Sequence, residues 1–172
     1  MIDSLSVALE VASQESAELL SNLLGLYMHD MSGIYPVEVG PDGRFRYEKL
    51  GLYWSQPETR FPFLVYCSGR VAGFALVTRG SPASDNPEDL DVAEFFILRG
   101  YRRGGIGRQA AILLWDRLPG HWVVRVSVAN HGALAFWRAA IEQYTGGAFA
   151  ESARFGSPHD WRVFTFRTAH LP

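Results

Sequence analysis

The chain has 172 residues, a length that suits one domain with a sizeable core and is short for two. Hydrophobic residues make up 48% of the chain and its formal net charge is -2, as in ordinary soluble globular proteins. A net charge so close to zero argues against a nucleic-acid-binding protein, for which a basic surface is typical.

Hydrophobic periodicity and turn residues predict the elements of the N-terminal half. Leucines recur at helical spacing as far as Met31, and Ser13 is the expected N-cap of that helix. Ser68-Gly69-Arg70 separates two β-rich runs and indicates a hairpin. In chain order we expect a strand, a helix, a loop, a short helix and the two hairpin strands, over residues 5–11, 19–31, 32–46, 47–54, 61–67 and 71–79.

The C-terminal half continues after a polar, proline-containing turn or loop over residues 80–90. Pro119-Gly120 predicts the end of one helix, and Asn130 opens another. We expect a strand, a helix, a strand, a helix and two strands, over residues 91–98, 106–118, 122–128, 132–144, 148–152 and 162–168. This order predicts a single α/β domain over residues 1–172 (α+β in some schemes), with a mixed sheet of about seven strands and about four helices on its faces.

Some kinds of chemistry and location are disfavoured by what the sequence lacks. Cys67 is the only cysteine, which excludes an intrachain disulfide and a thiolate metal cluster, so we expect a small buried residue on a strand. The N-terminus lacks a basic segment followed by an apolar one, and no apolar run approaches the ~20 residues of a membrane helix. We therefore expect a cytoplasmic protein without a metal and without a membrane partner.

The turn between the strand over 91–98 and the helix over 106–118 carries the strongest functional signal. It reads Arg102-Arg103-Gly104-Gly105-Ile106-Gly107-Arg108. Glycines let a ligand approach the main chain, and the free N–H groups at a helix start favour an anion. Together with the arginines, these features predict a turn that binds a pyrophosphate.

Two classes of pyrophosphate-containing ligand fit such a turn. Gly105-Ile-Gly107-Arg-Gln-Ala110 matches the fingerprint of dinucleotide-binding folds. That fingerprint requires an acidic residue about 20 residues later, where this chain has Ala129 and Asn130. The residues ahead of the turn also predict a hairpin instead of βαβ units. A nicotinamide cofactor is therefore the less favoured interpretation.

The other interpretation comes from a family resemblance. Residues 102–107 resemble the coenzyme A signature Q/R-x-x-G-x-G/A of the GNAT N-acetyltransferase superfamily. Phe95-Phe96-Ile97 resembles the family strand whose main chain pairs with the pantetheine arm, and Asn130-x-x-Ala133-x-x-Phe136-Trp137 resembles the second family motif. The likeness covers nearly the whole chain, and short segments are similar to a small subgroup of predicted acetyltransferases whose substrate is unassigned.

The resemblance implies an enzyme that moves an acetyl group from acetyl-CoA directly to a primary amine in a ternary complex. No metal and no covalent enzyme intermediate would be involved. For Phe95 and Phe96 only the main chain is assigned a role, and Asn130 also suits an N-cap. The implied coenzyme A site comprises Phe95, Phe96, Ile97, Arg102, Arg103, Gly104, Gly105, Ile106, Gly107, Arg108, Asn130 and Trp137.

Glu94 is the candidate general base, because it is the one acid within the apolar run 92–98. Burial of a carboxylate raises its pKa toward neutrality, which suits a base acting directly or through water. Asp91, nearer the polar loop, is the alternative base, and pairing of Glu94 with an arginine is the non-catalytic alternative.

Trp137 stands where many relatives carry a tyrosine that protonates the departing thiolate, and an indole cannot do so. Either the reaction uses no acid, or His131, Tyr101 or Tyr144 supplies one. A protein that binds acyl-CoA as a sensor without catalysis is the competing interpretation.

The end of the first helix is expected to form one wall of the acceptor pocket, through Tyr27, His29 and Asp30. We expect the acceptor to be a small amine in preference to a protein. Similar proteins are commonly homodimers, and no nucleic-acid partner is expected.

Overall fold

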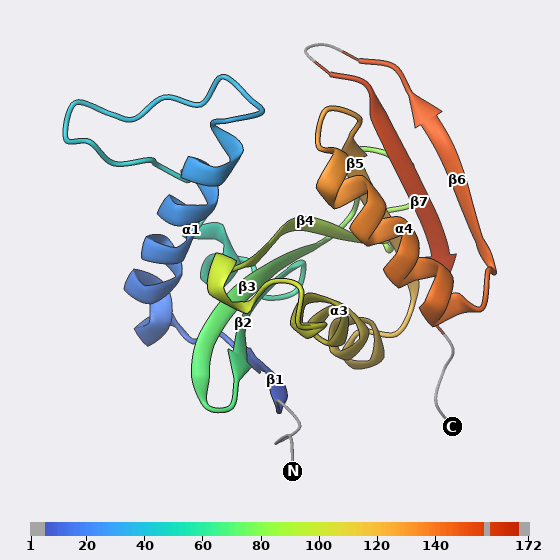
Figure 1. The fold of residues 1–172 in the computed structure, drawn as a ribbon, viewed down its shortest axis with the longest axis horizontal. Helices are drawn as coiled ribbons and strands as arrows, with labels where there is room; N and C mark the ends of the chain where they lie inside the picture. Colours follow the sequence, from blue (N-terminus) through green and yellow to red (C-terminus); the bar gives the residue numbers. More distant parts are fainter. Residues whose placement is uncertain (1–5, 157–158, 169–172) are drawn as a thin grey trace.

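The computed structural model describes residues 6–156 and 159–168. It contains one seven-stranded sheet in the order β1-β2-β3-β4-β5-β7-β6 (Figure 1). The predicted mixed sheet with four helices is confirmed. The elements are β1 (Val7–Val11), α1 (Ala17–Met31), α2 (Leu52–Ser55), β2 (Arg60–Cys67), β3 (Arg70–Arg79), β4 (Leu90–Ile97), α3 (Ile106–Arg117), β5 (His121–Ser127), α4 (His131–Thr145), β6 (Phe149–Arg154) and β7 (Trp161–Arg167).

Helices cover both faces of the sheet, and this explains the nearly continuous apolar sequence of β3. Phe74 and Leu76 pack with the leucines of α1 in one core cluster. Ala75 and Val77, which alternation directs to the opposite face, pack with Trp115 of α3 and with α4 in another. The cysteine on β2, Cys67, is buried in a third cluster, as predicted.

The centre of the sheet opens between β4 and β5, which among the described strands are the one parallel pair of neighbours (Figure 1). Their pairing is limited to Leu90 with Trp122 and Asp91 with Val123. Beyond those residues the strands diverge. In the pairing of β4 with β3, a bulge leaves Ala93 without a partner residue. The rest of β4 is therefore paired on its β3 side only.

Several element boundaries differ from the predictions. Ser13 is the N-cap residue of a 3-10 turn over Gln14–Ser16 that leads directly into α1, but its side chain makes no capping hydrogen bond. The short helix expected over 47–54 is a run of turns followed by α2. Leu5, the expected first residue of β1, lies outside the described residues.

The loop over 80–90 is held together by one buried carboxylate. Ser84 and Asn86 donate hydrogen bonds of 2.5 and 2.8 Å to Asp89, which is only 3% exposed. No described helix has the length and apolar character needed to cross a membrane.

Candidate active site

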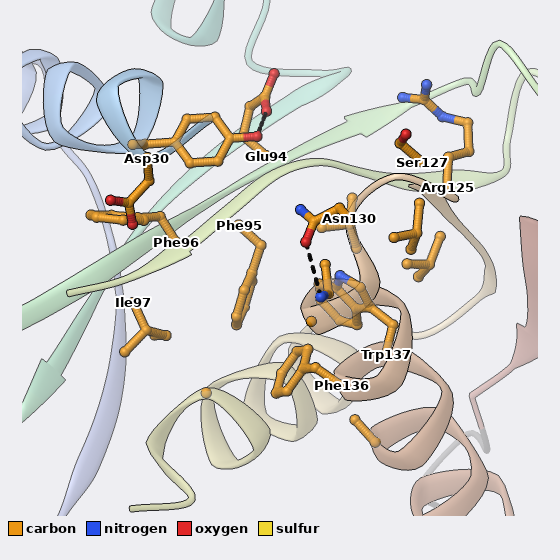
Figure 2. Close-up of a pocket in the computed structure, with 18 of the residues that line it drawn as sticks. Asp30, Glu94, Phe95, Phe96, Ile97, Arg125, Ser127, Asn130, Phe136 and Trp137 are labelled. Atoms are coloured by element: carbon orange, nitrogen blue, oxygen red, sulfur yellow. Dashed lines mark hydrogen bonds between the residues drawn. The ribbon is translucent and has the colours of Figure 1, made fainter. Parts of the chain in front are cut away.

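A cavity of about 970 Å³ lies where β4 and β5 diverge. It extends from Tyr27 of α1 to Ala139 and Gln143 of α4 and therefore passes through the opening in the sheet. Figure 2 shows residues of both sides, with Asp30 near α1 and Trp137 on α4. The predicted site residues that line it are Tyr27, Asp30, Glu94, Phe95, Phe96, Ile97, Arg102, Arg103, Gly105, Gly107, Arg108, Asn130 and Trp137.

Three predicted residues do not line this cavity. The ring of His29 lies 6.5 Å from the ring of Phe45, centroid to centroid, beside the loop that follows α1. Ile106 is buried in the core, 2% exposed, so that its side chain has a packing role. An added Cβ at Gly104 would meet nothing within 4 Å.

The start of α3 presents a row of free main-chain donors to the cavity. The first main-chain bond of the helix runs from the Gln109 N–H to the Gly105 carbonyl, at 3.0 Å. Among the described residues, the N–H groups of residues 103–108 have no hydrogen-bond acceptor. Such a row, at the positive end of a helix, favours an anion.

Two features of the chain allow this turn. Gly105 has φ 80°, in the left-handed region that glycine adopts without strain. Gly107 packs tightly, since an added Cβ there would lie 3.3 Å from Cε2 of Phe136 and 3.4 Å from Cγ1 of Ile97. A side chain at position 107 would therefore push against the wall of the cavity.

The three arginines of the turn have different surroundings. Arg102 donates through Nε to the Ile97 carbonyl at 2.7 Å and through Nη2 to Oδ2 of Asp30 at 2.5 Å, so its guanidinium is already engaged. Arg108 donates to Oε1 of Gln143 at 3.1 Å. Arg103 lines the cavity and makes no side-chain hydrogen bond to any described residue. Arg103 and Arg108 are thus the two arginines available to a ligand.

Asp30 ties α1 to the turn. Its carboxylate accepts hydrogen bonds from Arg99 and Arg102 at 2.7 and 2.5 Å. Although burial raises the pKa of Asp30, the two guanidinium groups outweigh it and hold the pKa below its ordinary value. Both carboxylate oxygens are occupied, which leaves Asp30 little capacity to bind an acceptor.

The edge of β4 that faces β5 carries free polar groups. The Leu98 N–H bonds to the Ala72 carbonyl at 2.8 Å, on the β3 side. Main-chain groups alternate in direction along an antiparallel strand, so those of Phe95 and Ile97 face the opening. The bond from Arg102 to the Ile97 carbonyl agrees with this direction.

Glu94 projects from β4 toward α1, away from Phe95 (Figure 2). The Tyr27 hydroxyl donates to its Oε2 at 2.6 Å, and the Tyr47 hydroxyl donates to its Oε1 at 3.1 Å. Burial raises the pKa of Glu94, and the two tyrosine hydrogen bonds offset this only in part. The result is a carboxylate that holds a proton more readily than an exposed glutamate does.

Asp91 has a different environment from Glu94. It is fully buried, and Arg125 donates to both of its oxygens at 2.8 Å. The Ser81 hydroxyl also donates to it. Both oxygens of Asp91 are thus engaged, and its main partner is Arg125.

On the α4 side the cavity has an aromatic wall. The ring of Phe95 lies 4.9 Å from that of Trp137 and 5.9 Å from that of Phe136, centroid to centroid. Trp137 is only 6% exposed and packs in the core. Oδ1 of Asn130 accepts a hydrogen bond of 3.1 Å from the Ala133 N–H, which confirms the predicted N-cap.

The sequence offered three alternatives to Trp137 as the acid, namely Tyr101, His131 and Tyr144. None of the three lines the cavity. The Tyr144 hydroxyl instead donates to Asp116 at 2.8 Å. The residues that hold the two candidate bases were not predicted. Tyr47, which donates to Glu94, lies in a segment without clear periodicity, and Arg125, which donates to Asp91, occupies an apolar strand. No group of three or more His, Cys, Asp or Glu side chains suited to a metal ion occurs in the described part of the chain.

One family model matches more than half of the chain. A model described as "Acetyltransferase (GNAT) family" matches residues 23–140. No curated protein matches the chain in sequence. An acetyltransferase structure from Thermus thermophilus is similar, with 17% identity, a TM-score of 0.68 and coverage of 95% of this chain and 97% of the other.

Two further similar structures are named for ribosomal substrates. One is RimL, a ribosomal L7/L12 alpha-N-protein acetyltransferase in complex with coenzyme A, with 15% identity, a TM-score of 0.64 and 95% coverage of each chain. The other is a ribosomal-protein-alanine N-acetyltransferase from Brucella melitensis, with 14% identity, a TM-score of 0.64, and coverage of 94% of this chain and 99% of the other. At these identities the likeness shows a shared fold.

Proposed function

The chain belongs to the GNAT acetyltransferase family, and from this premise we propose that it transfers the acetyl group of acetyl-CoA directly to a primary amine. The observation that carries the proposal is the row of free N–H groups at residues 103–108, next to the unpaired edge of β4. A pyrophosphate would bind the free N–H groups, and an arm that contains amides would pair with the unpaired strand edge.

In this proposal the N–H groups of residues 103–108 bind the pyrophosphate, with Arg103 and Arg108 adding positive charge. The pantetheine amides pair with the main chain of Phe95 and Ile97. The thioester then lies beside Glu94, at the opening in the sheet. A free N–H of β4 at that point would stabilise negative charge on the thioester oxygen.

The reaction requires a neutral amine and the alignment of two reactants. The amine nitrogen attacks the thioester carbonyl carbon, a C–N bond forms, and the C–S bond breaks. The proton lost by the nitrogen passes to Glu94, directly or through water. The sulfur leaves as the coenzyme A thiolate, which takes a proton from solvent water, and Glu94 returns its proton to the solvent. Fixing the two reactants can supply several kcal/mol, up to roughly 7–11 in ideal intramolecular cases.

A small acceptor is favoured by a contact between two distant segments. The ring of Tyr35, after α1, lies 4.8 Å from that of His159, before β7, in an edge-to-face arrangement. Tyr35 and Trp161 both line the cavity, so this contact joins two of its walls and would narrow the approach of a folded protein. A peptide amine remains the second candidate, because the named functions of two similar structures involve ribosomal proteins.

Release of the coenzyme A thiol in the presence of acetyl-CoA and a panel of amines tests the proposal. We expect release that depends on both the amine and the enzyme. Binding of acetyl-CoA without release for any small amine or peptide would contradict the enzyme function and support a sensor, for which the lack of an acidic group at Trp137 would be the structural reason.

A further inference from the structure

A second cavity, of about 520 Å³, lies between the segment 47–60 and the loop that follows β3. It shares Ala93, Glu94 and Arg125 with the larger cavity, so the two adjoin at the candidate base. Its volume suits a small molecule. A molecule within it could place one end at Glu94 and the other against residues of the 47–60 segment.

The cations that line this second cavity fall into two groups. Arg79 pairs with Glu88 at 3.1 Å, and Arg125 pairs with Asp91 at 2.8 Å, so the charges of these two are compensated. Lys49 and Arg60 are different, because no carboxylate of the described residues lies within 4.0 Å of either one. Two uncompensated positive charges thus lie on the same side of the cavity.

Arg60 is held in place by neutral groups. Its Nε donates to Oε1 of Gln56 at 2.9 Å, and its guanidinium carbon lies 5.5 Å from the centroid of the Tyr53 ring. These contacts fix the side chain without using its two terminal nitrogens, which donate to no described residue. An arginine held in this way can bind an anion through its free N–H groups.

Tyr53 adds a polar atom beside Arg60. The residue is 2% exposed and lines the second cavity, and its hydroxyl makes no hydrogen bond of ordinary geometry to a described residue. Tyr47 and Arg60, which also line the cavity, are its polar neighbours, so a ligand bound beside Arg60 would also lie near this hydroxyl. The carboxylate of Asp85, on the loop side, is exposed and would direct an anion toward Lys49 and Arg60 instead.

We infer that the second cavity binds the acceptor and that the acceptor is an amine bearing a carboxylate or phosphate group. The amine lies at Glu94, and the anionic group binds Lys49 and Arg60 at the other end. This inference rests on the proposed acetyltransferase function and specifies the class of its substrate. Opposite charges at the two ends of the cavity would select a molecule that carries both.

Pairs of acceptors that differ only in the anionic group test the inference. An α-amino acid is compared with its amide, and an amino alcohol with its phosphate ester, by thiol release at saturating acetyl-CoA. We expect at least one anionic member to show a kcat/KM roughly tenfold or more above that of its neutral partner. The two pairs distinguish a carboxylate from a phosphate.

Charge-removing variants locate the anion site. Lys49→Gln and Arg60→Gln should each raise KM for the preferred anionic acceptor by roughly tenfold with little change in kcat. This is expected because the lost interaction stabilises the bound substrate and the transition state equally. Neither should change KM for the neutral partner. Arg70→Gln, which removes the same charge at an exposed position on β3, should change neither constant. Lys49 is exposed, so its variant keeps the test valid if Arg60→Gln does not fold.

The outcomes distinguish failure of the inferred anion site from failure of the proposed acetyltransferase function. Equal kcat/KM for charged and neutral partners, or equal losses in Arg70→Gln and Lys49→Gln, would overturn the inference while leaving the acetyltransferase function in place. If calorimetry detects acetyl-CoA binding but neither a member of any pair nor any other amine or peptide of the panel releases thiol, the proposed function itself fails.

Discussion

The hydroxyl of Tyr27 donates a hydrogen bond of 2.6 Å to Oε2 of Glu94, joining α1 to the centre of the sheet. Tyr47 donates to the other oxygen at 3.1 Å. These two bonds hold a partly buried carboxylate in one orientation and stabilise its charged form, whereas its removal from water favours its neutral form. A carboxylate with such opposed influences suits a group that accepts a proton and releases it again.

Replacing Glu94 with Gln should lower kcat/KM for acetyl transfer by roughly 100- to 10,000-fold, the usual contribution of a general base. Calorimetry should detect unchanged affinity for acetyl-CoA, because the coenzyme site involves other groups. Glu10→Gln, at an exposed position on β1, is the matched control and should retain full activity. Full activity of Glu94→Gln would show that another group takes the proton.

The pH dependence of the reaction should respond to the two tyrosines. The raised pKa of Glu94 means that kcat/KM increases with pH over a range above the ordinary titration of glutamate. Tyr27→Phe and Tyr47→Phe each remove a bond that lowers this pKa, so the rising limb should move to higher pH. Tyr66→Phe, on β2, is the control. If the rising limb of kcat/KM stays at the same pH in both variants, the group that titrates there is not Glu94.

The same raised pKa predicts a pH-dependent stability difference. Since Glu94 binds its proton more tightly in the folded state than in the unfolded state, its contribution favours folding at acid pH and is lost as pH rises through the raised pKa. Glu94→Gln avoids this loss. Thermal unfolding should therefore show the variant gaining stability over the wild-type protein as pH increases from mildly acid to mildly alkaline. A constant difference across that range would contradict the raised pKa.

Asp91 should prove to be a stabilising residue without a catalytic role. Asp91→Asn leaves Arg125 without its charged partner, and breaking such a buried pair should cost about 3 kcal/mol of unfolding free energy in urea denaturation. Glu88→Gln, which breaks the exposed pair with Arg79, should cost less than about 1 kcal/mol. Loss of transfer activity in folded Asp91→Asn, with the pH limb abolished, would instead identify Asp91 as the base.

Gly107 should be required for binding of the coenzyme. In Gly107→Ala the new methyl group would press on the rings and side chains that form the wall of the cavity. We expect acetyl-CoA affinity to fall by roughly tenfold or more, which corresponds to about 1.4 kcal/mol or more. At Gly100 an added Cβ meets nothing within 4 Å, so Gly100→Ala should bind normally in the same calorimetric titration. Equal acetyl-CoA affinities of Gly107→Ala and the wild-type protein would show that a methyl group at position 107 does not disturb the coenzyme site.

Features that depend on local sequence could be predicted. Strands and helices follow from apolar periodicity, and the glycines with arginines after β4 indicate an anion site from residue types and spacing alone. The burial of Glu94 could also be expected, since it lies in an apolar run. In each case the physical cause acts within a few neighbouring residues.

Features that depend on packing between distant segments could not be predicted. The engagement of Arg102 results from Asp30, 72 residues earlier in the chain. Tyr47 reaches Glu94 across 47 residues, from a segment without a regular pattern. The divergence of β4 from β5 also has no local signal, because the apolar residues of β5 would be typical of a strand in either arrangement. These contacts decide which predicted residues are available to a ligand.

Calorimetric titration of the protein with acetyl-CoA tests the central claim most directly. We predict saturable binding with a Kd on the order of 1–100 µM, a range consistent with typical KM values. A nicotinamide dinucleotide should give no heat. Tight binding of the dinucleotide, with no heat from acetyl-CoA or any other acyl-CoA, would contradict the claim that the start of α3 and the edge of β4 together form a coenzyme A site.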